Sequence, residues 1–136
     1  MDTRTKLIDT AHRLLRSQGL RETGLNEIIQ ESGSPRGSIY HHFPGGKEQL
    51  FIEALQDAGE KVAENIRAAM AEEKNPVAAL RKFARPYVED LVKSDYQVGC
   101  PIGNAAIDAA ANSASVRLVC DQIFDSISRL SNSLRP

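Results

Sequence analysis

The sequence predicts an all-α fold, in which three short N-terminal helices are followed by a longer helical region. Apolar residues recur every three or four positions along almost the whole chain, which is the spacing of one helix face. Glycine and proline gather mainly between these periodic stretches, where helices end. Alternation of apolar and polar residues, which is typical of a strand, is nowhere long enough to predict one. The hydrophobic content of 41% is sufficient for a packed core.

The first two predicted helices are bounded by glycines. Apolar residues from Leu7 to Leu15 share one helical face, and Gly19 follows where a C-terminal glycine would end the helix. A second, short helix is predicted over residues 25–32, and Gly33 is expected to stop it.

A third short helix is expected to start at Ser34-Pro35 and to reach about residue 42, because serine caps helices and proline suits the first helical position. Its inner face carries Ile39 and Phe43, four residues apart. Its outer face offers hydrogen-bond donors or close backbone approach, from Arg36, Gly37, Ser38, Tyr40, His41 and His42. Two short helices joined by a tight turn form a helix-turn-helix, whose second helix can enter the major groove of DNA.

Four further helices are predicted, over residues 47–75, 77–93, 101–111 and 116–134. Gly59 lies inside the first of these at a cost of about 1 kcal/mol against alanine, and it permits a bend or a close helix contact. Pro86 lies inside the second and is expected to kink it. Residues 94–99 are predicted to form a loop, and Asn112-Ser113 is predicted to break the helical pattern.

The charge pattern by itself gives little support for binding to nucleic acid or to another charged partner. The formal net charge is −1; residues 1–50 carry seven basic and six acidic side chains, and residues 51–136 carry ten and twelve. This asymmetry is too small to indicate nucleic-acid binding by itself. No apolar run approaches about 18 residues, and the N-terminus lacks the apolar segment of a signal peptide. We therefore expect no membrane contact and a cytoplasmic location.

Three other functions are weighed against ordinary structural roles. His41 and His42 point about 100° apart on a helix, which makes a poor chelate, so no metal is expected. Cys100 and Cys120 lack metal spacing and are expected to be inert core residues rather than a redox pair. Gly45-Gly46-Lys47 lacks the rest of a phosphate-binding loop, and no nucleophile–base arrangement is evident. Neither a cofactor nor catalysis is therefore expected.

Lys47 opens the long fourth helix, where a cation is locally unfavourable by up to about 1 kcal/mol. An adjacent phosphate would remove this penalty and would use the free backbone N–H groups of the helix end. The alternative is a merely solvated lysine beside Glu48.

Residues 1–50 resemble the DNA-binding domain of the TetR/AcrR family of transcriptional regulators. The resemblance rests on Gly24-Leu25-Asn26-Glu27-Ile28-Ile29, on Ser32-Gly33-Ser34-Pro35-Arg36-Gly37-Ser38-Ile39-Tyr40-His41-His42-Phe43 and on Lys47-Glu48-Gln49-Leu50. Residues 35–38 and 43–47, and the Gly99-Cys100-Pro101 run, are similar to a multidrug-repressor-like subgroup. Residues 51–136 resemble the family only in their helical layout.

The resemblance implies a set of DNA contacts on and around the third helix. The expected residues are Thr23, Ser34, Arg36, Gly37, Ser38, Tyr40, His41 and Lys47. Arg36 can bond guanine edges with two donors or pair with phosphate, and both alternatives stay open. At the position of Gly24 the family often has a threonine or serine, which caps the second helix and contacts phosphate through its hydroxyl. Glycine lacks this hydroxyl, so Thr23 is expected to make the phosphate contact instead.

The resemblance also implies an effector pocket within the helical bundle. From spacing alone, aromatic residues such as Phe83 and Tyr87 are plain core. With the resemblance, the expected pocket residues are Phe83, Tyr87, Leu91, Cys100, Ile107 and Phe124. The expected effector is a small apolar or aromatic molecule.

We therefore expect a DNA-binding domain over residues 1–46 and a helical effector-binding and dimerisation domain over residues 47–136. A homodimer would place two recognition helices about 34–36 Å apart on palindromic double-stranded operator DNA. An effector would tilt the fourth helix and release the repressor. The family usually continues with two further helices that form the dimer interface, so the effector domain is expected to be incomplete. The alternative is a helical ligand-binding or protein-interaction module without operator binding.

Overall fold

A computed structural model of the protein describes residues 2–109 and 113–132, and within them it contains helices and no strand. The helices are α1 (Thr3–Glu22), α2 (Leu25–Ser32), α3 (Ser38–His42), α4 (Gly46–Glu72), α5 (Pro76–Lys93), α6 (Pro101–Ala109) and α7 (Ala114–Asn132). The all-α prediction is confirmed. Ala111, Asn112 and Leu134, which fall in the predicted last two helices and the break between them, lie outside the described residues.

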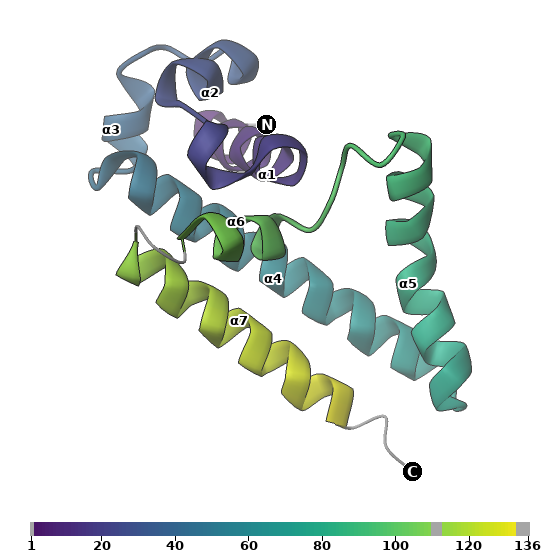
Figure 1. The fold of residues 1–136 in the computed structure, drawn as a ribbon. Helices are drawn as coiled ribbons and strands as arrows, with labels where there is room; N and C mark the ends of the chain where they lie inside the picture. The colour runs from purple at the N-terminus through teal and green to yellow at the C-terminus, as the bar shows by residue number, and fades with distance from the viewer. Residues whose placement is uncertain (1, 110–112, 133–136) are drawn as a thin grey trace.

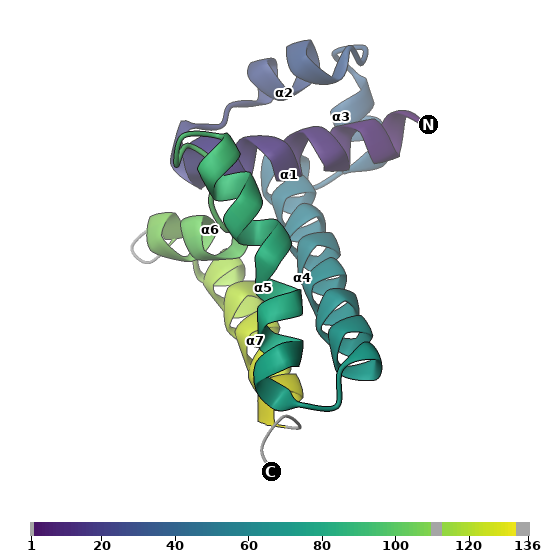
Figure 2. The same cartoon turned by 90° about the vertical axis from the view of Figure 1, so that its right-hand side faces the viewer.

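The long helix α4 connects the two ends of the molecule. Helices α1 to α3 gather around its N-terminal end, and α7 lies along it (Figure 1). The short α6 packs against α1, α4 and α7. Helix α5 folds back from the far end of α4 and returns toward α1 through the loop that precedes α6 (Figure 2). Helix α4 is therefore shared by the N-terminal helices and by the rest of the bundle.

Helix α1 differs from its prediction at the C-terminus. Gly19 interrupts the helix with a φ of +80°, but a further helical turn follows and ends at Glu22. A side chain at position 19 would be obstructed as well as strained, because an added Cβ would lie 2.6 Å from the Asp108 carboxylate. The same carboxylate accepts a hydrogen bond of 3.0 Å from the Arg21 backbone N–H. This close approach fixes α6 beside the end of α1.

The turn between α2 and α3 confirms one prediction and corrects another. Gly33 ends α2 in the left-handed region, with a φ of +65°. Pro35 does not open the next helix, because its carbonyl instead accepts hydrogen bonds from the backbone N–H and the hydroxyl of Ser38. Helix α3 therefore begins at Ser38, and Ser34 does not cap it.

The remaining helices begin within two residues of their predicted starts. Asn75 caps α5, because its side-chain oxygen accepts hydrogen bonds of 2.9 and 3.2 Å from the first free N–H groups. The helix continues through Pro86 to Lys93.

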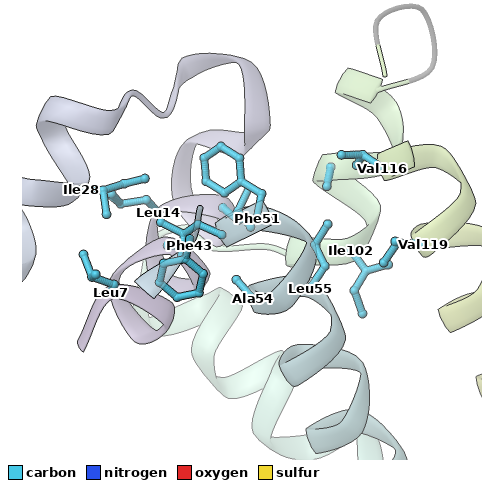
Figure 3. Close-up of a cluster of buried hydrophobic side chains, with 14 of the residues drawn as sticks. Leu7, Leu14, Ile28, Phe43, Phe51, Ala54, Leu55, Ile102, Val116 and Val119 are labelled. Atoms are coloured by element: carbon cyan, nitrogen blue, oxygen red, sulfur yellow. The ribbon is translucent and has the colours of Figure 1, made fainter. Parts of the chain in front are cut away.

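One hydrophobic core joins the N-terminal helices to the rest of the bundle. It runs from Leu7 and Phe43 through Leu55 of α4 to Ile102 and Val119 of α6 and α7 (Figure 3). Since protein cores are close-packed, a shift of α6 or α7 must be accommodated by the helices that carry α3.

Candidate functional site

The predicted inner face of the third helix, α3, is confirmed. Ile39 and Phe43 are both fully buried. A helix of five residues is far too short to be stable alone, so its position depends on this packing. Burial of each side chain is worth roughly 1.5–3 kcal/mol. The rest of α3 is thereby left to face outward in one fixed orientation.

The outer face of α3 presents exposed donors. Tyr40 is 61% exposed, and His41 is also exposed. Arg36 precedes the helix, and its Nη2 donates a hydrogen bond of 3.0 Å to the Asn26 side-chain oxygen on α2. The sequence did not predict this role of Asn26 as the acceptor for Arg36. The signal available was a polar residue near the start of the predicted second helix, where it is exposed. This bond restricts the direction in which the guanidinium can reach.

Gly37 has an ordinary right-handed backbone, with φ of −75° and ψ of −11°. An added Cβ there would meet nothing within 4 Å. The protein itself therefore does not require glycine at this position. A bare backbone beside α3 leaves room for a partner to approach closely.

Lys47 is a partly buried cation that has no ion-pair partner among the described residues. Its Nζ lies 5.4 Å from the centroid of the Phe51 ring. The adjacent Glu48 does not neutralise it, because the Glu48 carboxylate accepts hydrogen bonds from the hydroxyls of Ser115 and Ser113 at the start of α7. These bonds hold the pKa of Glu48 below its ordinary value.

Two expected contacts do not face outward. Thr23 is fully buried, and its hydroxyl donates a hydrogen bond of 2.7 Å to the Gly19 carbonyl. The expectation that Thr23 contacts phosphate is therefore wrong, because the hydroxyl instead stabilises the end of α1. The Ser34 Oγ is enclosed and lacks a hydrogen-bond partner within the described chain. Ser34 is thus neither a helix cap nor an outward donor in this conformation.

A cavity of about 520 Å³ lies between α1, α4, α5 and α7, and the loop before α6 closes one side. This volume is within the range of small-molecule sites. Five of the six predicted pocket residues line it, namely Phe83, Tyr87, Leu91, Cys100 and Phe124. Ile107 does not, because it is 77% exposed on α6 outside the cavity.

The sequence reasoning missed the polar wall of this cavity. His12 and Arg16 of α1 and Lys61 and Asn65 of α4 line it. Each pair is spaced four residues apart, which places both members on one helical face and was the available signal. Burial lowers the pKa of His12, and the positive charges of Lys61 and Arg16 lower it further.

The cavity rim is bonded directly to α1. The Gly99 N–H donates a hydrogen bond of 2.9 Å to the Arg16 carbonyl, and the Arg16 Nε donates one of 3.2 Å to the Gly99 carbonyl. The Asn104 side-chain amide donates to the carbonyls of Leu15 and Arg16 at 3.1 and 3.2 Å. The chain entering α6 thus cannot move without disturbing α1.

The cysteines do not match their prediction fully. Cys120 is buried, and burial raises the pKa of its thiol. Cys100 is exposed, because it precedes α6 at the mouth of the cavity.

Within residues 2–109 and 113–132, no cluster of three metal-ligating side chains occurs. In the same residues, no helix combines the length and the hydropathy that a membrane span needs.

Two family profiles match the chain in succession. Residues 7–54 match the bacterial regulatory proteins of the tetR family, and residues 76–134 match the C-terminal domain of transcriptional regulators like LmrA and YxaF. The HTH-type transcriptional regulator YxaF of Bacillus subtilis is 41% identical over 92% of this chain. The HTH-type transcriptional regulator LmrA of the same organism is 37% identical over 90% of it. The chain spans 65% of the length of each of these relatives.

Solved structures agree in fold. A TetR regulatory protein from Rhodobacter sphaeroides superposes with a TM-score of 0.87 at 24% identity, covering 96% of this chain and 69% of its own. A TetR-family transcriptional regulator from Streptomyces coelicolor gives 0.76 at 25% identity, covering 94% and 69%. The two profiles and the relatives lead to one conclusion: the chain belongs to the TetR family of bacterial regulatory proteins.

Proposed function

We propose that this chain supplies the operator-binding domain and the effector cavity of a transcriptional repressor. The observation that carries the proposal is the surface around α3. There, Arg36 and Lys47 lack a carboxylate partner in the described chain, while Ile39 and Phe43 fix the helix from below. Phosphate supplies the missing negative charge, and the major groove accepts one helix of this kind.

We assign DNA binding to residues 1–46 and effector binding to residues 47–136, with Lys47 at the boundary contacting DNA and with His12 and Arg16 of α1 completing the cavity wall. Arg36, Gly37, Ser38, Tyr40, His41 and Lys47 are the proposed DNA contacts. A homodimer would place two copies of α3 about 34–36 Å apart on a palindromic operator in the bacterial cytoplasm. Because α4 begins beside Lys47 and passes the cavity, an effector that tilts α4 changes this separation. Release requires that the effector bind the non-DNA conformation more tightly.

The test is salt-dependent binding of the full-length protein to DNA from the region upstream of its own gene. Replacement of Lys47 with alanine should weaken binding to all sequences and reduce the salt slope by about one. Lys74→Ala is the matched control, because Lys74 is an exposed lysine beyond the far end of α4. Failure of the wild-type protein to bind any upstream fragment specifically at low salt would refute operator binding.

Arg36→Ala separates the two modes of arginine contact. A contact to guanine predicts a loss of about 1–3 kcal/mol and relaxed preference at a single base pair. A contact to phosphate alone predicts a uniform loss across sequences. Asn26→Ala tests the support from α2, and it should reproduce part of the Arg36→Ala effect because the guanidinium loses its fixed direction.

A further inference from the structure

We propose that the cavity binds an organic anion, in which an acidic group lies against His12, Arg16 and Lys61 and an apolar body lies among Phe83, Leu91 and Phe124. This inference rests on the proposed function only in treating the cavity as the effector site. It narrows the expected effector from any apolar molecule to a weak acid.

The two sides of the cavity differ in character. The side formed by α1 and α4 carries the three nitrogen-bearing side chains named above, together with the Asn65 amide. The side formed by α5 and α7 is largely apolar and aromatic. No carboxylate of the described residues lines the cavity, so a ligand there meets positive charge without a competing negative charge in the wall.

The cations are held in place from outside the cavity. Lys61 pairs with Asp57 one turn earlier on α4, with 2.9 Å between Nζ and Oδ2. Arg16 pairs with Asp90 of α5, with 3.4 Å between Nη2 and Oδ2. Neither carboxylate is part of the cavity lining. The Arg16 Nη1 has no partner within the described chain, which leaves it free to donate to a ligand.

His12 lies between these cations. The charged groups that face it are Asp9 and Arg16 on its own helix and Lys61 and Asp57 on α4, with Asp90 of α5 beyond Arg16. Burial and the two cations keep the imidazole neutral near pH 7. An anion in the cavity reverses this balance, since it stabilises the imidazolium. Ligand binding is therefore expected to take up a proton at pH values just above the lowered pKa of His12, and the affinity should rise as the pH falls toward that pKa.

The experiment compares three probes of one shape by isothermal titration calorimetry on the full-length protein. These are biphenyl-4-carboxylate, its neutral carboxamide and the cationic 4-phenylbenzylamine. The carboxylate should bind at least about tenfold more tightly than the amide, because charge-assisted hydrogen bonds are about twice as strong as neutral ones, and the amine should bind most weakly. Titration in buffers of different ionisation enthalpy measures proton uptake, which His12→Gln should abolish.

Variants locate the charge preference. Lys61→Gln should reduce the ratio of carboxylate to amide affinity, and Arg16→Gln should reduce it further. Arg67→Gln is the control, because Arg67 lies on α4 outside this cavity. Arg16 also supports the chain before α6, so a thermal melt must show that its variant is folded, and Lys61→Gln gives the test without that contact.

The proposal is overturned if the amide or the amine binds as tightly as the carboxylate, or if none of the three binds at millimolar concentration. It is also overturned if Lys61→Gln and Arg67→Gln have the same effect on the affinity ratio. Operator binding is measured separately with DNA alone. A protein that prefers the carboxylate but binds no operator would support the anion site and refute the repressor function.

Discussion

Gly59 allows a close contact between α4 and α7, and its replacement by alanine gives a sharp test of the bundle packing. An added Cβ would lie 2.9 Å from Cγ2 of Ile123, 3.2 Å from Cγ1 and 3.4 Å from Cδ1. Alanine gains about 1 kcal/mol of helix propensity over glycine. Overpacking of a core costs about 1–3 kcal/mol. Ile123 is buried and β-branched, so it cannot easily rotate away, and the cost should fall in the upper part of this range.

The expected net result for Gly59→Ala is a loss of about 1–2 kcal/mol in the free energy of unfolding, measured by urea titration with circular dichroism. Gly103→Ala is the matched control within α6, because its added Cβ would lie 3.7 Å from the Cys100 Cβ, an ordinary contact. That variant should gain up to about 1 kcal/mol. In an Ile123→Ala background the obstructing atoms are absent, so Gly59→Ala should become neutral or stabilising.

Stabilisation of the wild-type background by Gly59→Ala, to the same degree as by Gly103→Ala, would refute this reasoning. It would mean that α7 can shift without cost, so the α4–α7 spacing would not be fixed by packing. An equal effect of Gly59→Ala in the Ile123→Ala background would show that Ile123 is not the cause.

Three further predictions concern the site and its connections. Gly37→Ala should leave the free energy of unfolding unchanged or raise it by about 0.4–1 kcal/mol, because the native backbone suits alanine. Operator affinity, measured by fluorescence anisotropy, should fall. Unchanged affinity would exclude a close approach of DNA to the Gly37 backbone. The pKa of His12 is lower in the folded protein than in the unfolded chain, so the unfolded chain binds more protons below about pH 6.5. The free energy of unfolding should therefore fall as the pH drops below that value. In urea titrations at several pH values, His12→Gln should flatten this decline. Asn104→Ala should cost about 0.5–1.5 kcal/mol, because the carbonyls of Leu15 and Arg16 lose their side-chain donor while the Arg16 carbonyl keeps the Gly99 N–H. An equal response from the exposed Asn132→Ala would show that the Asn104 contact contributes nothing.

Local chemistry made most of the fold predictable. Helical periodicity and glycine stops are properties of neighbouring residues, so Gly33 and the inner face of α3 could be identified from the sequence. The start of α3 could not, because Ser34-Pro35 satisfies the rules for a helix cap and for a turn equally well. The position of the helix start depends on which groups donate hydrogen bonds to the Pro35 carbonyl. These groups are the backbone N–H and the hydroxyl of Ser38.

The site was predictable only where one helix defines it. Tyr40 is exposed because it stands on the outer side of a short helix with one buried face, and Arg36 is exposed in the turn just before that helix. Exposure of Cys100 depends on how the chain enters α6, which no local pattern specifies, and Thr23 turns inward to the Gly19 carbonyl where α1 is interrupted. The proximity of His12 and Lys61 on one side of the cavity likewise requires the packing of two helices whose residues are far apart in the chain.

Helix α1 is shared by both halves of the proposed mechanism. Its buried face packs in the core with Phe43 beneath α3, and His12 and Arg16 on the same helix form part of the cavity wall. A tenfold change in operator affinity needs a coupling free energy of about 1.4 kcal/mol. The Arg16 bond to the Gly99 carbonyl is worth about 1 kcal/mol, and the partly exposed ion pair with Asp90 up to about 1 kcal/mol more. Contacts of this size can supply a tenfold coupling only if the operator-binding and effector-binding conformations differ in them, which is what the proposed tilt of α4 past α1 requires.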